Sequence, residues 1–257
     1  MEKYIAGYST NIGSKKNVNQ DSLCIRKADL NGREVLMVVV CDGMGGLSRG
    51  EAASAAVVQA FAESFLRDLP EPLLSGAWEE IEVKWRKLIT EMNEKLWRYG
   101  EMQGMQLGTT LTVLLLFCQR YLVAQVGDSR VYALGRELIQ ITEDQSLVAR
   151  EVKRGNITCE EAARDPRRNI LLECIGVSST VNPEFFFGKV EKGERFLVCS
   201  DGVWHDITHE EMMREFQREF KNEKEISERL NQIILQNIER GEQDNITAVY
   251  IQQIEKG

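Results

Sequence analysis

Aspartates at the edges of apolar runs are the residues of this sequence best suited to chemistry. Asp42 follows Val-Val-Val-Cys and begins Asp-Gly-Met-Gly-Gly, so a carboxylate stands at the end of a buried strand beside three glycines. A buried carboxylate is costly unless a positive charge neutralises it, and glycines let a ligand approach the backbone closely. Taken alone, however, the stretch is more typical of a strand that ends in an ordinary Asp-Gly turn.

The same setting recurs elsewhere in the chain. Four further aspartates adjoin strand-like apolar runs, namely Asp21, Asp128, Asp201 and Asp244. If these strands share a sheet sandwich, the carboxylates gather at one edge, where only cations make their mutual repulsion tolerable. Oxygen ligands select hard ions such as Mg²⁺ or Mn²⁺, and the chain has only two histidines to offer nitrogen. Composition and spacing alone leave open the alternative that each aspartate caps its own turn.

The elements that must position these aspartates separate into strand runs and helix runs. We expect strands over residues 4–10, 22–27, 38–41, 109–117, 121–126, 130–134, 137–141, 194–199 and 246–251. Helices are expected over 48–69, with Ala52, Ala56, Ala60 and Phe65 on or near one face, over 78–99, after the capping box at Thr208, and before Gly241. This order predicts an α+β layered domain rather than a repeating βαβ chain.

Composition narrows the class of protein. A chain of 257 residues is long enough for one large domain, residues 1–257. Its 40 acidic and 32 basic residues give a net charge of -8, which argues against nucleic acid as a partner. The chain has no apolar segment long enough to cross a bilayer and no signal at its start, so we expect a cytoplasmic protein without a membrane partner. The six scattered cysteines indicate reduced, buried thiols.

Eight short blocks occur in an order that is specific to one family. They are Asn19-Gln20-Asp21, Asp42-Gly43-Met44-Gly45-Gly46, Gly50-Glu51-Ala52-Ala53-Ser54, Gly108-Thr109-Thr110, Gly127-Asp128-Ser129-Arg130, Pro166-Arg167-Arg168-Asn169-Ile170-Leu171, Ser200-Asp201-Gly202 and Asp244-Asn245. On these blocks the chain resembles the metal-dependent protein serine/threonine phosphatases of the 2C type, in the layout of their small bacterial members. The resemblance implies a four-layer sandwich of two antiparallel β-sheets flanked by α-helices, with a helical flap over residues 146–180.

The resemblance also implies a binuclear Mn²⁺ or Mg²⁺ site. Asp42 would bridge the two metals, and the carbonyl of Gly43 would complete the first site. Asp201 and Asp244 would hold the second metal. A water activated by the two ions would then attack phosphorus directly, with Asp42, Asp201 and Asp244 as the catalytic carboxylates.

Two more aspartates complete the implied set of ligands. Asp21 would act through water, and Asp128 would help to bind a third, weaker metal together with Asp201. Direct attack by the activated water needs no phosphoenzyme, and the lack of a Cys-x5-Arg phosphate loop argues against a cysteine nucleophile.

Three positions depart from the family pattern. Lys16 stands where an arginine usually clamps the substrate phosphate, and a lysine offers a point charge rather than a bidentate fork. We therefore expect Lys16 to bind phosphate more weakly. Met44 and Leu47 stand where histidines occur in other members, so the proton for the leaving group must come from water or elsewhere.

Two further features are interpreted as structural. His205 and His209 are four residues apart, but the cap residue Thr208 between them argues against a shared helix face and a metal pair. The arginine-rich run over residues 164–168 is more typical of a solvated flap surface than of a contact for phosphopeptide charges.

The leading hypothesis is a monomeric phosphatase that acts on phosphoserine and phosphothreonine in proteins and opposes a serine/threonine kinase. One alternative is a catalytically weakened, phosphoprotein-binding regulatory module, which Lys16 and the missing histidines motivate. Another keeps the catalysis but directs it at a small phosphoester.

Overall fold

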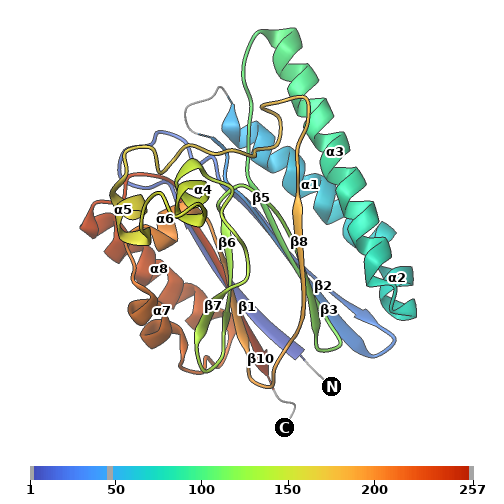
Figure 1. The fold of residues 1–257 in the computed structure, drawn as a ribbon. Helices are drawn as coiled ribbons and strands as arrows, with labels where there is room; N and C mark the ends of the chain where they lie inside the picture. Colours follow the sequence, from blue (N-terminus) through green and yellow to red (C-terminus); the bar gives the residue numbers. More distant parts are fainter. Residues whose placement is uncertain (1–2, 45–48, 255–257) are drawn as a thin grey trace.

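The computed structural model describes residues 3–44 and 49–254. Two five-stranded antiparallel sheets face each other, and helices cover their outer faces (Figure 1). The first sheet has the order β1 (Lys3–Asn11), β10 (Ile246–Ile254), β9 (Arg195–Cys199), β6 (Arg130–Leu134) and β7 (Leu138–Gln140). The second has the order β2 (Ser22–Leu30), β3 (Arg33–Cys41), β4 (Leu111–Phe117), β5 (Arg120–Val126) and β8 (Glu184–Lys189). The expected sandwich of two antiparallel sheets is confirmed.

Helices form the two outer layers. The second sheet is covered by α1 (Gly50–Asp68), α2 (Pro70–Ser75) and α3 (Trp78–Gln103), and the first by α7 (His209–Phe216) and α8 (Glu223–Arg240). The short helix α6 (Asp201–Trp204) follows β9 directly. Two more helices, α4 (Leu147–Lys153) and α5 (Cys159–Arg164), lie in the segment expected to form the flap. None of the helices within the described residues is long and apolar enough to span a membrane.

Strand β3 shows why an apolar run without alternation belongs at the centre. Leu36, Val38 and Val40 pack between the two sheets, whereas their neighbours Met37 and Val39 pack against α1 and α3. Successive side chains of a strand point to opposite faces, so a strand with a core on both sides needs apolar residues at every position. The end of β3, with Asp42 after it, is therefore held firmly by two cores.

The structure corrects several expectations about the elements. Strand β8 and helices α2 and α6 lie where no element was predicted. In α1 the prediction is wrong for Ala52, which is exposed, whereas Phe65 is buried and Ala56 and Ala60 are partly buried against the same core, as expected. The predicted helix start at Ser48 lies outside the described residues. All six cysteines are unpaired thiols, but Cys118 and Cys159 are exposed rather than buried.

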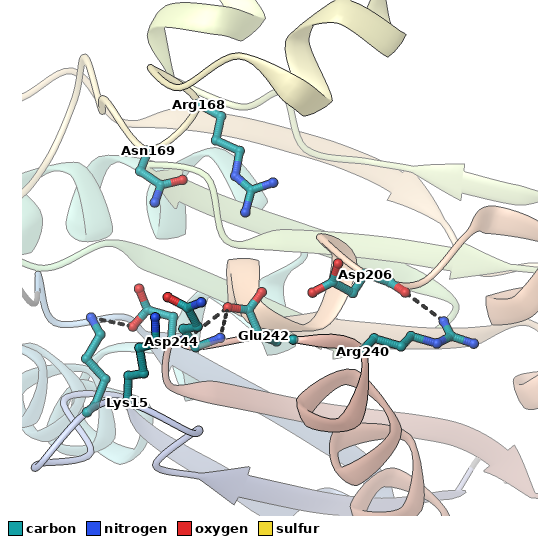
Figure 2. A pocket seen from close by; sticks show the side chains of 10 residues that line it. Lys15, Arg168, Asn169, Asp206, Arg240, Glu242 and Asp244 are labelled. Atoms are coloured by element: carbon teal, nitrogen blue, oxygen red, sulfur yellow. Dashed lines mark hydrogen bonds and ion pairs between the residues drawn. The ribbon is translucent and has the colours of Figure 1, made fainter.

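The flap segment is built from two short helices with defined starts. Ser146 caps α4 by accepting a hydrogen bond from the N–H of Ala149, and Thr158 forms a capping box with Glu161 at the start of α5. The loop after α5 carries Arg168 and Asn169 towards the end of the sandwich where the aspartates lie (Figures 1 and 2).

Candidate metal centre

The backbone of Asp42 is locked to the start of β4. The N–H of Asp42 donates to Thr110 Oγ1 at 2.9 Å, and its carbonyl accepts from the Thr110 N–H at 2.8 Å and from Thr109 Oγ1 at 2.9 Å. Because its backbone donor and acceptor are both engaged, Asp42 is positioned by its neighbours rather than by a flexible turn.

Gly43 lies in a space that admits only glycine. Its N–H donates to the Gln20 carbonyl at 3.1 Å, and a Cβ added to it would lie 2.4 Å from the Gly50 carbonyl oxygen and 2.6 Å from that of Gln20. The close approach joins the end of β3, the start of α1 and the loop before β2. Asp42 and Asp21 are thereby brought to the same end of the sandwich. Gly45 and Gly46 lie outside the described residues.

Asp21 and Asp201 each have a carboxylate oxygen that is shielded from solvent and lacks a hydrogen-bond partner among the described residues. The other oxygen of Asp21, Oδ2, accepts from Ser200 Oγ at 3.0 Å, which ties the loop before β2 to the residue before α6. Orphaned carboxylate oxygens in a buried setting are costly, so they indicate a place where a cation belongs.

The five aspartates form one electrostatic cluster. Burial raises the pKa of Asp42 well above its usual range, and the charges of the other four, Asp21, Asp201, Asp128 and Asp244, raise it further. For Asp21, burial and the charges of Asp201 and Asp244 raise the pKa to about 7, although hydrogen bonds from Thr247 and Ser200 oppose the shift. Such a cluster is stable in its ionised form only beside positive charge.

Asp128 belongs to the same cluster, and Asp201 is the neighbouring charge that acts on it most strongly. Burial raises its pKa well above the usual range, and the charges of Asp201 and Asp144 add to the effect, whereas Arg130 acts in the opposite direction. Arg130 is itself committed to Asp144, whose two oxygens accept its Nε and Nη2 hydrogens at 2.9 and 2.6 Å. The neighbouring arginine therefore leaves the charge of Asp128 largely uncompensated.

Lys16 is the sequence-predicted phosphate ligand, and it lies against Asp244. Its Nζ is 2.6 Å from Asp244 Oδ1. Burial works against the ammonium form, but the hydrogen bond to Asp244 and the charges of Asp42 and Asp201 raise the pKa of Lys16. The loop that carries Lys16 is fastened by Asn245, whose Nδ2 donates to the Ile12 and Val18 carbonyls at 2.8 and 3.2 Å.

A cavity of about 340 Å³ opens beside this ion pair. Its walls come from four parts of the chain: the loop before β2, the flap segment, the residue after His205, and the end of α8 with the connection to β10. The lining residues are Lys15, Lys16, Arg168, Asn169, Asp206, Arg240, Gly241, Glu242, Gln243 and Asp244. Figure 2 shows Arg168 and Asn169 extending from the flap towards Asp244 and Glu242. Arg168 of the arginine run thus lines the cavity, and the interpretation of the run as a solvated flap surface stays a prediction.

The donor set fits a hard divalent cation that keeps part of its water. Among the residues that the structure describes, no three Asp, Glu, His or Cys side chains close into a ligand group by themselves. Mg²⁺ commonly binds through one or two carboxylates and retains several waters. The orphaned oxygens of Asp21 and Asp201, together with a main-chain carbonyl such as that of Gly43, suit that mode of binding.

Two residues near the aspartates were not predicted as part of the site. Glu242 and His205 are both buried, and they contact each other between Asp201 and Asp244. The spacing of four residues between Asp201 and His205 on one helical turn is the signal that pointed to their proximity.

His205 ends α6 and His209 begins α7, so the two histidines do not share a helix. Met44 Sδ lies 2.8 Å from Cys174 Sγ and offers no proton, and Leu47 lies outside the described residues.

Comparison with known proteins gives a consistent set of matches. A family model described as "Protein phosphatase 2C" matches residues 10–235. The serine/threonine phosphatase stp of Listeria monocytogenes is 32% identical over 262 residues, covering 96% of this chain and 95% of its own. Protein phosphatase PhpP of Streptococcus pneumoniae is 31% identical over 213 residues, covering 79% and 80%.

Solved structures agree with these sequence matches. The serine/threonine phosphatase Stp1 from Staphylococcus aureus superimposes with a TM-score of 0.83 at 30% identity, covering 98% of this chain and 95% of its own. The catalytic domain of the phosphatase PstP, solved with two manganese ions, gives a TM-score of 0.80 at 27% identity, covering 99% and 100%.

Proposed function

Because the chain belongs to the protein phosphatase 2C family, we propose that it hydrolyses phosphoserine and phosphothreonine in proteins at a centre of two Mn²⁺ or Mg²⁺ ions. The observation that carries the proposal is the cluster of five mutually repelling aspartates, two of which have orphaned, buried oxygens. Its relatives along nearly the whole chain are named serine/threonine phosphatases, which favours this class of enzyme over a small-molecule phosphoesterase.

We assign the ions to residues as follows. Asp42 would serve both ions, with the carbonyl of Gly43 at the first and the carboxylates of Asp201 and Asp244 at the second. Asp21 would act through water, and Asp128 would hold a third, weaker ion together with Asp201. When bound, the ions supply an activated water and neutralise the charge that develops on the phosphoryl oxygens.

Residues of the chain itself also contribute to the reaction. Lys16 carries a positive charge to the rim of the aspartate cluster, where it binds a phosphoryl oxygen as well as Asp244. The locked backbone of Asp42 keeps its carboxylate in place as the charge changes during the reaction. Since Met44 offers no acidic proton, the proton for the leaving alkoxide must come from water or from another group.

The biological setting is part of the proposal. The natural substrates are phosphoproteins made by a serine/threonine kinase, whose products this enzyme reverses. We place it in the cytoplasm as a monomer, with neither nucleic acid nor membrane as a partner, in keeping with its net charge of -8.

The test is phosphate release from a phosphothreonine peptide with Mn²⁺, with EDTA and with the Asp201→Asn variant. Turnover should require Mn²⁺ and fall at least a hundredfold in the variant, whereas Asp68→Asn, a change at the end of α1, should leave it unaltered. The peptide should be preferred to nucleotide and sugar phosphates. No turnover by folded, Mn²⁺-bound wild type would instead favour the regulatory binding module.

A further inference from the structure

Glu242 holds the peptide unit that carries Asp244. It lies in the connection between α8 and β10 and is only 6% exposed. Its Oε1 accepts hydrogen bonds from the N–H groups of Gln243 at 2.6 Å and of Asp244 at 2.9 Å. A buried carboxylate with two backbone donors on one oxygen is a rigid support, so the position of Asp244 depends on Glu242.

The other oxygen of Glu242, Oε2, is connected to Asp201 by contacts with the imidazole of His205. His205 Nδ1 is 3.4 Å from Glu242 Oε2 and 3.9 Å from Asp201 Oδ2, and the His205 side chain is 6% exposed. Glu242 Oε2 is shielded from solvent and has no hydrogen-bond partner among the described residues, so the imidazole of His205, which can donate through Nδ1, is the group placed to serve it. One imidazole nitrogen thus faces carboxylates from two different parts of the chain.

The imidazole of His205 is itself held in place. His205 ends α6, and its backbone N–H donates to the Asp201 carbonyl at 3.1 Å. Its ring packs edge-on against Trp204, with centroids 4.3 Å apart, and the Arg130 guanidinium covers the Trp204 ring at 3.4 Å. The side chain therefore has little freedom to turn away from Asp201 and Glu242.

We propose that Glu242 and His205 are positioning residues that together fix the separation of Asp201 and Asp244, and thereby set the affinity of the cation held between these two aspartates. The inference rests on the proposed function, since it assumes that Asp201 and Asp244 bind a cation. Neither residue belongs to the sequence blocks that carry the family resemblance.

The charge of Glu242 reinforces its geometric role. Its Oε1 faces two backbone N–H donors, which is the setting of an ionised carboxylate. An additional fixed negative charge beside two carboxylate ligands increases their attraction for a divalent cation.

The test measures Mn²⁺ affinity by calorimetry on folded, metal-free protein, so that its readout does not depend on turnover. His205→Leu removes the shared N–H and should weaken Mn²⁺ binding roughly tenfold or more, the usual effect of losing an outer-shell partner. His205→Asn places an amide N–H where Nδ1 lies and should restore most of the affinity. Glu242→Gln should weaken binding to a similar extent.

Glu239→Gln is the matched control. Glu239 is an exposed residue near the end of α8, three positions before Glu242. Its substitution removes one negative charge and should leave the Mn²⁺ affinity unchanged. In addition, His205→Leu should cost little further affinity when Glu242→Gln is already present, because the two residues act through one contact. Losses that multiply in the double variant would overturn the proposal.

The outcomes separate this inference from the proposed function. If wild type binds Mn²⁺ and hydrolyses phosphopeptide, but His205→Leu lowers only thermal stability and not Mn²⁺ affinity, the two residues are merely packed and the inference fails alone. An Asn variant as weak as the Leu variant would likewise contradict it. If wild type binds no Mn²⁺, the inference and the proposed function fall together.

Discussion

At the scale of single residues, Lys16 offers the sharpest test of substrate binding. A guanidinium can contact two phosphoryl oxygens at once, whereas the ammonium of Lys16 offers a point charge that Asp244 already shares. We therefore predict that Lys16→Arg lowers the KM for a phosphothreonine peptide a few-fold with little change in kcat. Lys95→Arg, a change at an exposed lysine of α3, is the matched control. An unchanged or raised KM in Lys16→Arg would contradict the assignment.

Asp21 gives a prediction about pH. Its pKa is raised to about 7 in the folded protein, chiefly by burial, against about 3.9 for an unfolded aspartate. The unfolded chain therefore releases this proton more readily, and the metal-free fold loses stability as pH rises from about 4 through about 7. In EDTA, Asp21→Asn should be more stable than wild type at about pH 8 and gain much less at about pH 5. Urea unfolding at both pH values measures the difference; an equal effect at both would refute it.

Some residues of the site could be predicted from short sequence blocks, and others could not. The aspartates stand in short blocks that can be recognised in the sequence, Lys16 lies three residues before the first block, and the structure brings all of them to one end of the sandwich. Glu242 and His205 have no such block. They meet only because α6 and the connection after α8 converge, which is a tertiary fact that single-sequence patterns do not contain.

At the scale of elements, the end of β3 depends on a close approach that only glycine permits. Gly43→Ala would force a methyl group to within 2.4 Å of the Gly50 carbonyl oxygen. We predict a loss of about 1–3 kcal/mol in the free energy of unfolding and weaker Mn²⁺ binding, because the start of α1 must move away from Asp42.

The matched control for that change is Gly135→Ala, in the turn between β6 and β7. A Cβ at Gly135 meets no atom within 4 Å, so the substitution should leave both stability and Mn²⁺ affinity nearly unchanged. Denaturant unfolding and calorimetry on the two alanine variants provide the comparison. Equal effects of the two substitutions would show that the tight packing around Gly43 does not support the site.

Elements with a strong periodic or turn signal could be predicted, and those stabilised only by neighbours could not. The capping box at Thr208 and the helix stop at Gly241, whose φ is +114°, lie where expected. Strand β8 was missed because Phe185, Phe186 and Phe187 show no alternation, and the strand is defined by its pairing with β5. In α1 the alanines gave a weak signal: Ala53 and Val57 are fully buried, whereas Ala52 is exposed.

At the scale of the whole molecule, the aspartates adjoin strands of both sheets. Asp42 follows β3 of one sheet, whereas Asp201 and Asp244 adjoin β9 and β10 of the other. A cation between them binds the folded chain and not the unfolded one. At a hundredfold excess over its Kd, one such ion adds about 2.7 kcal/mol of stability.

We therefore predict that saturating Mn²⁺ raises the Tm by roughly 5–10 °C for a domain of this size. The rise should be lost in Asp42→Asn and kept in Asp68→Asn, which lies at the end of α1. Differential scanning calorimetry in EDTA and in Mn²⁺ provides the values. A Tm that is the same in both solutions would mean that no cation links the sheets.

The order of the sheets could not be deduced from the strand pattern, because alternation fixes the face of a residue but not the neighbour of its strand. The pairing of β1 with β10, the first and last strands, connects residues more than two hundred positions apart, from Lys3 with Ile254 to Asn11 with Ile246. The resemblance to the family supplied the expectation of two antiparallel sheets, and the structure confirms it.

The most direct test of the central claim, that these aspartates hold the catalytic ions, is to count Mn²⁺ at equilibrium on wild type and on Asp42→Asn. We predict two tightly bound ions per chain for wild type and the loss of both in the variant, because we assign Asp42 to both ions. Wild type that binds no Mn²⁺, or a folded Asp42→Asn protein that keeps both ions, would contradict the account.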